Sequence, residues 1–408
     1  MSERASNYCR CCNSTNMFMF LALGDHGPAQ GFLKQDQLNE TLYGLNTHAC
    51  LDCGLIQVPN RIPPNFFRHY LYVPSTASQM HEHFDQLAKK LKTNFLINDD
   101  DLFVDIGCND GLLLKAAHDI GIKTLGIDPA ENIVQLAKDK GLDVISEYFN
   151  PEIAKQALKL FGNAKVITSN NTFNHIDDLI NFMEGVKELM ADDGIFVVEV
   201  PQAIEYVNKL MFDNIYHEHL SVFSVKSLKD LYAQFGMEIF DIEPLVVQGG
   251  SMRVFARNKQ NKADCKVLQE WLKKEQAVGL LDRNTYVRYK KAVEQIRDEL
   301  LDILKRAKAE DKSIIGYGAA AKGNTLLNYY QIGNETLDYI ADKNTLKHGL
   351  YSPGMHIRVE PTEKINETKP DLMLILAWNL ADEIMEQQKA FREAGGQFII
   401  PFPKPKIV

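Results

Sequence analysis

The sequence predicts an α/β protein made of a small N-terminal module and two larger units, each built around a mainly parallel, doubly wound sheet of the Rossmann-like kind. Two observations support this prediction. Four cysteines form two C-x-x-C pairs near the N-terminus, and from residue 102 onward apolar strand-like segments alternate with helical segments in two successive runs. The length of 408 residues suits two or three hydrophobic cores. We expect the three parts to span residues 1–65, 66–257 and 258–408.

The composition is that of an ordinary globular chain, with 45% hydrophobic residues, 24% charged residues and a net charge of −9. Binding of nucleic acid requires a clustered basic face, so no nucleic-acid partner is expected. The N-terminal residues lack the apolar stretch of a secretion signal, and nowhere do about 18 apolar residues follow one another. We therefore expect a cytoplasmic protein with reduced cysteines and no membrane partner.

The N-terminal cysteines predict a structural zinc site. Cys9 pairs with Cys12, and Cys50 pairs with Cys53, so two tight turns supply the four thiolates of a tetrahedral site. Without a metal, so small a glycine-rich unit would lack an adequate core. Four thiolates leave no open coordination position, which disfavours catalytic zinc. Cys11 leaves open a zinc site in which it replaces a neighbouring cysteine as a ligand. The wide separation between the two pairs requires a loop that protrudes.

The two larger units are justified by their strand and helix patterns. A connector helix is expected from Met80 to Leu96, where apolar residues recur at helical spacing. A charged stretch at 266–310 also has a helical period. The expected strands of the middle unit lie at 102–106, 124–127, 165–168 and 195–200, and those of the C-terminal unit at 313–317, 337–341, 372–376 and 396–400.

A glycine turn after the first strand of the middle unit predicts a cofactor site. Gly107 and Gly111 permit close backbone approach, and Asp128, which ends the next strand, can accept both hydroxyls of an adenosine ribose. The turn reads G-x-x-x-G, unlike the G-x-G-x-x-G of dinucleotide sites, and the acids beside it repel phosphate. S-adenosylmethionine (SAM) carries positive charge and no phosphate, and the segment resembles the first motif of class I SAM-dependent methyltransferases. The predicted cofactor-binding residues are Asp105, Gly107, Asn109, Gly111, Asp128 and Asn170.

Two polar stretches after later strands supply candidate catalytic residues. Asn171 and His175 follow the third strand, at the carboxyl edge where open α/β sheets bind ligands. Tyr216, Glu218 and His219 follow the fourth strand. The H-E-H sequence lacks the spacing of a helical zinc-protease motif. An imidazole flanked by a carboxylate and a phenol suits a general base, and a purely structural histidine is the alternative.

The C-terminal unit contains a second glycine-rich turn, which leaves another activity open. Residues 316–323 fit G-x-G-x-x-A after an apolar strand, and Asp342 ends the next strand. Taken alone, this pattern predicts a dinucleotide site and thus an NAD(P)-dependent nucleotide-sugar oxidoreductase or a bifunctional reductase. Lys322 and Asn324, at the start of the following helix, suit the diphosphate of a different ligand. A turn-rich segment at 347–356 is expected to border the same site.

Several motifs in one order resemble nucleotide-sugar C-methyltransferases. They are the four-cysteine module, D-I-G-C-N-D-G at 105–111, N-x-x-x-H at 171–175, Y-H-E-H-L-S-x-F-S at 216–224, Q-G-G-S-M-R at 248–253 and G-Y-G-A-A-A-K-G-N at 316–324. The resemblance covers nearly the whole chain, and the Y-H-E-H and G-Y-G-A motifs are more specific than the glycine loop. It implies a zinc-binding module, a class I SAM-methyltransferase domain and a C-terminal α/β lobe that helps to hold the nucleotide-sugar.

That family methylates carbon 3 of 4-keto deoxysugars, and the resemblance implies roles for matching residues. His219 is implied as the general base, with Tyr216, Glu218, Asn171 and His175 around the sugar. The family's Tyr-Tyr-Ser-Ser is replaced here by Tyr72-Val-Pro-Ser, which leaves open whether Tyr70 or Tyr72 reaches the active site. We place Tyr72 with the catalytic residues. The residues expected to bind the substrate are Tyr70, Ser251, Arg253, Lys322, Asn324, Lys347 and His356.

The chemistry of C-methylation independently favours a histidine base. A carbon nucleophile forms beside a ketone when a base removes the adjacent proton and hydrogen-bond donors stabilise the enolate oxygen. Histidine has a suitable pKa, and Tyr216, His175 or Asn171 could donate to the enolate. SAM supplies the electrophilic methyl group, so no metal is needed for the transfer.

The remaining expectations concern assembly and other functions. We expect a monomer or a small homo-oligomer. A non-catalytic scaffold protein is the remaining alternative to an enzyme. Trp378 and Asn379 are expected to form part of the core and a helix cap, with a functional role as the alternative.

Overall fold

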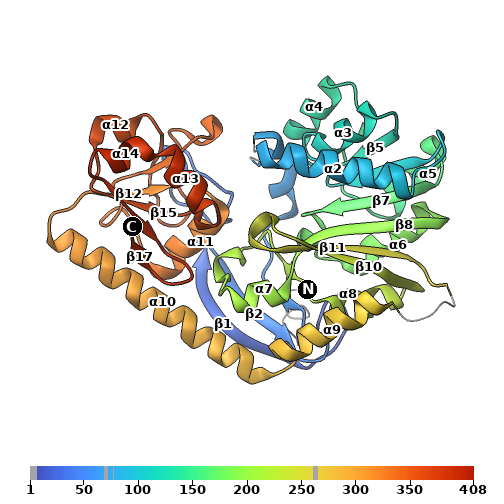
Figure 1. Cartoon of the computed structure of the whole chain (residues 1–408), viewed down its shortest axis with the longest axis horizontal. Coiled ribbons are helices and arrows are strands. Elements are labelled where there is room, and N and C mark those ends of the chain that lie inside the picture. Colours follow the sequence, from blue (N-terminus) through green and yellow to red (C-terminus); the bar gives the residue numbers. More distant parts are fainter. Residues whose placement is uncertain (1–6, 69–71, 77, 261–264) are drawn as a thin grey trace.

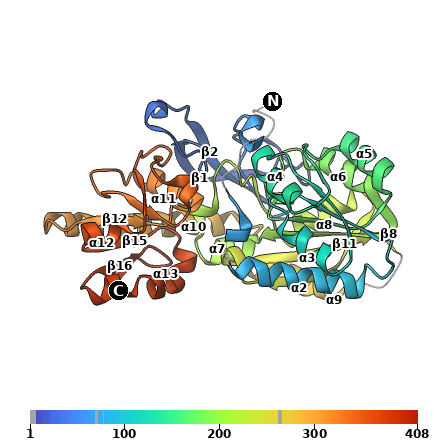
Figure 2. The same ribbon diagram turned by 90° about the horizontal axis from the view of Figure 1, so that it is seen from above.

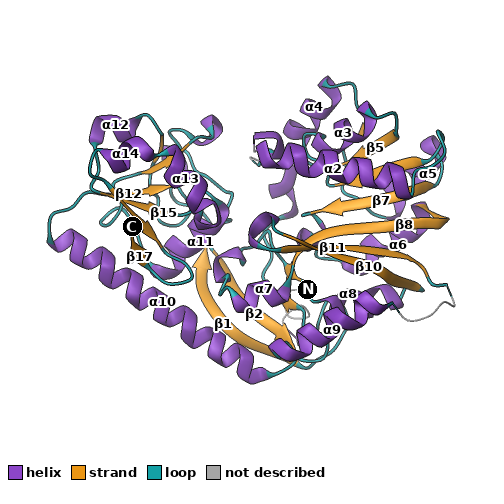
Figure 3. Ribbon diagram, in the orientation of Figure 1, coloured by secondary structure: helices purple, strands orange, loops and turns teal. Residues whose placement is uncertain are grey.

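The computed structural model describes residues 7–68, 72–76, 78–260 and 265–408. Two α/β bodies lie side by side, and a curved antiparallel sheet and a long helix lie beneath them (Figure 1). Colouring by secondary structure shows that each body has a sheet with helices packed on it (Figure 3). The predicted α/β class with two Rossmann-like units is thus confirmed.

The N-terminal module contains a four-stranded antiparallel sheet in the order β1-β2-β3-β9. Its strands are β1 (Met17–His26), β2 (Tyr43–Cys50), β3 (Ile56–Gln57) and β9 (Ser221–Val222). β1 is long for so small a module, with ten residues, because it packs along a helix of the C-terminal half. The last strand of this sheet comes from the middle of the sequence. The β1–β2 hairpin rises between the two bodies when seen from above (Figure 2).

The middle body has a seven-stranded sheet in the order β10-β11-β8-β7-β4-β5-β6. The parallel strands are β4 (Leu102–Ile106), β5 (Lys123–Ile127), β6 (Val144–Ile145), β7 (Ala164–Asn170) and β8 (Met190–Pro201). The sheet continues beyond β8 with β11 (Ser251–Asn258), which is antiparallel to β8, and with β10 (Met237–Leu245), which is antiparallel to β11. β5 lies beside β4 on one side and β7 lies beside it on the other, so the order of the strands reverses at β4. This switch point is where doubly wound sheets bind ligands.

The helices of the middle body alternate with its strands, as the pattern predicts, and the first of them precedes β4 as the expected connector helix. They are α2 (Ser78–Asn94), α3 (Leu112–Asp119), α4 (Glu131–Asp139), α5 (Pro151–Phe161), α6 (Leu179–Leu189), α7 (Ala203–Asn208) and α8 (Val225–Ala233). Helix α5 shows why one begins where it does. The side chain of Asn150 accepts from the backbone N–H of Ile153, and Pro151 has no N–H that would be left unpaired.

The C-terminal body repeats the arrangement with a six-stranded sheet in the order β14-β13-β12-β15-β16-β17. Its strands are β12 (Ile314–Tyr317), β13 (Ile340–Asp342), β14 (Val359–Pro361), β15 (Leu372–Ile375), β16 (Gln397–Ile400) and β17 (Lys406–Ile407), of which only β17 is antiparallel to its neighbour within this sheet. Its helices are α11 (Ala321–Tyr330), α12 (Lys364–Thr368), α13 (Ala381–Gln387) and α14 (Lys389–Glu393). All eight strands expected from the sequence are present, with shifted ends at β8 and β13.

Two helices connect the bodies. α9 (Lys266–Val278) packs against α7, α8 and β10 of the middle body, although it follows the expected boundary at residue 257. α10 (Arg283–Ala309) runs beneath β1 towards the C-terminal body, and Phe20 of β1 lies 4.8 Å from the ring of Tyr286. One hydrophobic core cluster includes residues of all three parts. Throughout the described part of the chain, none of the helices combines the length and apolar composition that a membrane span requires.

Candidate functional site

The four predicted zinc ligands are gathered in one place. The sulfur atoms of Cys9 and Cys53 lie 3.5 Å apart, those of Cys12 and Cys50 lie 3.6 Å apart, and all four fall within 4.8 Å of one another. A tetrahedral zinc with Zn–S bonds of about 2.3 Å needs sulfurs separated by roughly 3.8 Å, so the set fits the metal. Cys11 is buried outside the cluster, which settles the register in favour of Cys9 and Cys12.

Zinc analysis should find about one zinc per chain in S4 coordination. Replacing Cys12 by serine should release the metal and lower the stability of the module, because three thiolates hold zinc less tightly than four. The matched control is Cys11→Ser, which removes a neighbouring thiol outside the cluster and should keep the metal. Retention of a full equivalent of zinc by Cys12→Ser would contradict the assignment.

The glycine turn after β4 adopts a conformation that requires glycine at two positions. Gly107 and Gly111 have φ values of 82° and 76°. A Cβ atom on Gly107 would lie 2.1 Å from Oγ1 of Thr172, in the loop that follows β7. The predicted cofactor loop therefore touches the segment that leads to His175.

Asp128 lies at the end of β5 with the acceptor geometry expected for a ribose. Its two carboxylate oxygens accept the backbone N–H groups of Asn109 at 2.9 Å and Ala130 at 2.8 Å. Each oxygen keeps a further lone pair, so the carboxylate can still accept two hydroxyls. Burial raises the pKa of Asp128. The residues present therefore fit the adenosine part of SAM.

Asp105 and Asn170 support the loop from within the sheet. Asp105 Oδ1 accepts from the hydroxyl of Thr168 at 2.6 Å and from the amide of Asn170 at 3.4 Å. Burial raises the pKa of Asp105 to about 7. Among the described residues, the buried Oδ1 of Asn170 has no hydrogen-bond partner. Asn109, with φ of 51°, donates its side-chain amide to the carbonyl of Tyr72 at 3.1 Å.

His219 forms a hydrogen-bonded pair with Tyr216. The Tyr216 hydroxyl lies 2.6 Å from Nε2 of His219, and the two rings stack at 3.9 Å. Nδ1 of His219 lies 2.9 Å from the carbonyl oxygen of Asn214. A carbonyl can only accept, so we assign the ring proton to Nδ1, and Nε2 then accepts from the phenol. The imidazole thus has its basic nitrogen on the side of Tyr216.

The second predicted histidine lies beside the first. The ring centroids of His175 and His219 are 5.0 Å apart. Burial lowers the pKa of His175 to about 4 and places that of His219 well below 6.5, with further lowering from His175 and the charge of Lys322. Both imidazoles are therefore neutral at pH 7, and His219 is in the form that can accept a proton.

Glu218 holds a loop of the N-terminal module in place. Its Oε1 accepts the backbone N–H of Gln30 at 2.8 Å, and burial raises its pKa to about 7. The other oxygen, Oε2, has no hydrogen-bond partner in the described part of the chain. From the C-terminal body, the amide of Asn324 donates to the carbonyl of Ala29 at 2.7 Å. The peptide between residues 29 and 30 is therefore clamped between the two bodies.

Lys322 is the residue of the C-terminal body whose charge acts on His219. Its ammonium donates to Oδ1 of Asn379 at 2.7 Å and lies 5.5 Å from the ring centre of Trp378. The indole N–H of Trp378 donates to the buried carboxylate of Asp213 at 2.5 Å, so Trp378 joins the two bodies, whereas Asn379 bonds Lys322 of its own body. Burial lowers the pKa of Lys322, and Asp213 opposes that shift. Nothing in the sequence pattern singles out Asp213.

Two further predicted substrate residues contact the loop between β1 and β2 of the N-terminal module. Lys347 donates to the carbonyl of Ala319 at 2.7 Å, with its ammonium over the ring of Phe32. His356 lies 2.9 Å from a carboxylate oxygen of Glu40. This loop is the protrusion that the wide separation of the cysteine pairs requires.

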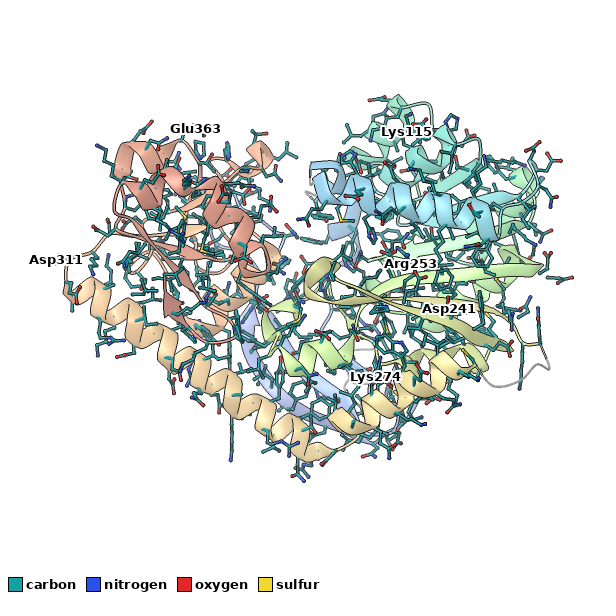
Figure 4. The ribbon with its side chains drawn as sticks, in the orientation of Figure 1. Lys115, Asp241, Arg253, Lys274, Asp311 and Glu363 are labelled. Atoms are coloured by element: carbon teal, nitrogen blue, oxygen red, sulfur yellow. The ribbon has the colours of Figure 1, made fainter. Side chains whose placement is uncertain are left out.

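The remaining predicted site residues have other surroundings. Arg253, which we expected to contact substrate, is 7% exposed and is ion-paired to Glu199 and Glu243 of the adjacent strands. Figure 4 marks the position of Arg253 in the middle body. Ser251 is buried in the same strand. Asn171 has φ of 51° in the turn after β7, and Tyr72 is exposed. Tyr70 lies outside the described residues.

Comparison with known proteins decides the family. A family model for the C-methyltransferase C-terminal domain matches residues 246–403, one for a methyltransferase domain matches 79–242, and one for a zinc binding domain matches 9–67. The C-methyltransferase NovU of Streptomyces niveus is 32% identical over 409 residues, covering 99% of this chain and 97% of NovU. This chain belongs to the C-methyltransferase family. The C-methyltransferase is accordingly SAM-dependent, and its zinc is structural.

Solved structures of methyltransferases are also similar to parts of the C-methyltransferase. Magnesium protoporphyrin IX methyltransferase from Synechocystis PCC 6803 with bound SAM is 14% identical and covers 44% of this chain and 79% of its own, with a TM-score of 0.34. A SAM-dependent methyltransferase from Anabaena variabilis is 14% identical and covers 42% of this chain and 84% of its own, with a TM-score of 0.35.

Proposed function

We propose that this C-methyltransferase acts on a nucleotide-linked 4-keto deoxysugar and methylates carbon 3, next to the ketone. The observation that carries the proposal is the pair formed by His219 and Tyr216. A buried, neutral imidazole whose basic nitrogen accepts from a phenol is suited to removing a weakly acidic proton. The carbon beside a ketone is such an acid once its enolate oxygen is stabilised.

The residues supply each part of the proposed reaction. His219 accepts the carbon 3 proton at Nε2, either through the Tyr216 hydroxyl that occupies its lone pair or directly once that hydroxyl turns away, and the enolate forms as the C–H bond breaks. His175, Asn171 and the ammonium of Lys322 are the candidate groups that stabilise the enolate oxygen. The cofactor supplies the electrophilic methyl group. Carbon 3 forms a bond to that methyl as its bond to sulfur breaks, so charge and atoms balance without a redox partner.

The substrate assignment is tested with a panel of nucleotide-linked 4-keto deoxysugars, including dTDP, GDP and CDP sugars. Incubation with SAM should add one methyl group to at least one member, and NMR of the product should place it on carbon 3. The same sugars reduced at C-4 should stay unmethylated, because they have no enolisable proton. Transfer to a hydroxyl oxygen or to a sugar without the ketone would contradict the proposal.

SAM affinity should depend on Asp128 and not on its counterpart in the C-terminal body. Asp342 also ends the second strand of its sheet and accepts backbone N–H groups, from Ala319 at 2.5 Å and Asn344 at 2.7 Å, so Asp342→Asn is a matched control. Asp128→Asn should weaken SAM binding by about 1.5 to 3 kcal/mol, because a charge-assisted bond to ribose is lost. Calorimetry with SAM and with NADH checks this. Saturable NADH binding without SAM binding would instead support an oxidoreductase.

A further inference from the structure

The segment that carries His219 is bonded to the zinc-binding module on both sides of the histidine. Before it, Nε2 of His217 lies 3.1 Å and 3.2 Å from the carbonyl oxygens of Tyr43 and Gly44 in β2. After it, the carbonyl of Leu220 accepts the N–H of Val58 at 3.0 Å, and β9 pairs with β3. The module therefore fixes the backbone from which the imidazole projects.

Arg10, which lies between the zinc ligands Cys9 and Cys12, spans this junction. Its Nη1 donates to the carbonyl of Leu220, the residue after His219, and lies 3.3 Å from the hydroxyl of Ser221. Its Nη2 donates to the carbonyl of Val58 at 2.9 Å. The side chain is only 7% exposed. A planar guanidinium suits this arrangement because it offers several donors in a fixed geometry.

The same guanidinium also faces the segment that carries His175. Nη2 of Arg10 lies 3.7 Å from a carboxylate oxygen of Asp177, two residues after His175. Arg61 pairs with the other oxygen of Asp177 at 2.8 Å. Arg10 thus connects the two segments whose imidazoles lie 5.0 Å apart.

Binding of zinc does not by itself require these contacts. A C-x-x-C turn needs only its thiolates, and Asp52, within the other pair, bonds the side chains of Ser14 and Asn16 at 2.5 Å and 2.7 Å. Those partners lie at the surface of the module. One polar residue of the zinc turns therefore stabilises the module alone, whereas Arg10 reaches the segments of both histidines.

We propose that Arg10 is a positioning residue for methyl transfer. Its contacts with Leu220 and Asp177 fix the positions of His219 and His175 relative to each other. This inference rests on the proposed function, in which His219 is the base. Through Arg10 the zinc-binding module contributes to catalysis as well as to folding. A misplacement of the imidazole by about 1 Å is enough to slow proton removal by about 100-fold.

The test compares Arg10→Met with the matched control Asp52→Asn in the full-length, zinc-loaded protein. For Arg10→Met, kcat should fall by about 10- to 100-fold, with KM values, zinc content and SAM affinity close to wild type. Histidine-selective NMR, with the His219 signal assigned from His219→Asn, needs no substrate and should show an altered tautomer or shift. Asp52→Asn should leave both readouts unchanged. A wild-type kcat and an unshifted His219 signal in Arg10→Met would overturn the proposal, and so would an equal loss in Asp52→Asn.

Arg10→Lys keeps the charge and tests the inference even if Arg10→Met does not fold. A lysine can replace one donor of Arg10 but not the planar set of donors of the guanidinium. The kcat of Arg10→Lys should therefore lie below that of wild type but above zero, and its His219 signal should be shifted. Wild-type values for both would overturn the proposal. Full activity of His219→Asn would refute the proposed base, and the His219 signal of the Arg10 variants would still report whether Arg10 positions that ring.

Discussion

Replacing His219 by asparagine should reduce methyl transfer by about two to four orders of magnitude, because a positioned general base is lost. Asparagine can still accept from Tyr216 and fill most of the space, so SAM and sugar binding should persist. The measurement is single-turnover methyl transfer at saturating substrates. His217→Asn is the control: its ring lies against the carbonyl oxygens of Tyr43 and Gly44, so its loss should affect the rate only through the position of the His219 segment and lower it far less than loss of the base.

The pH dependence gives the same prediction a second readout. Burial lowers the pKa of His219, so the wild-type rate should fall only at a pH well below the 6.5 of a free imidazole. Protonation of the base then removes the activity from the acid side. An acid limb at or above pH 6.5, or a His219→Asn variant with the wild-type rate, would contradict the assignment of the base.

Replacing Lys322 by methionine should have the second largest effect. We propose that the ammonium of Lys322 contacts the anionic substrate, so its loss should weaken sugar binding by about 1.5 to 3 kcal/mol, a change of roughly 10- to 150-fold in KM. The charge of Lys322 also lowers the pKa of His219, so its removal should shift the acid limb of kcat upward. Initial rates across pH measure both effects.

Lys343→Met is the matched control for Lys322. Lys343 lies in the same body and donates to Gln387 at 2.6 Å on the exposed surface, so its removal makes the same change in net charge away from His219. It should leave KM and the pH profile unchanged. Equal shifts in the two variants would mean that overall charge, and not the position of Lys322, is responsible.

The parts of this account that could be predicted from the sequence are those with a local signal. The strand at 102–106 and its glycine turn appear where a mostly apolar run is followed by two glycines within a few positions. Tyr216 and His219 are three residues apart, so a single turn brings their side chains together. The zinc ligands were predictable because spacing within each C-x-x-C pair is itself the signal.

The parts that could not be predicted depend on contacts between distant segments. Arg10 and Leu220 are separated by 210 positions, and Asp213 and Trp378 by 165. The pairing of β9 with β3 recruits a strand of two residues, too short for any periodicity. The ion pair of Arg253 is another such contact: the strand register places Glu199 directly opposite it, a pairing that the sequence does not reveal.

The most direct test of the central claim is exchange of the carbon 3 proton of the 4-keto sugar with solvent deuterium. NMR would follow the substrate in D2O with the wild-type enzyme and S-adenosylhomocysteine, so that deprotonation is seen without methyl transfer. The account predicts enzyme-dependent exchange at carbon 3 that His219→Asn lowers by at least about 100-fold while binding is retained. Exchange at the wild-type rate in His219→Asn, or methylation by wild type from a substrate that cannot exchange, would contradict it.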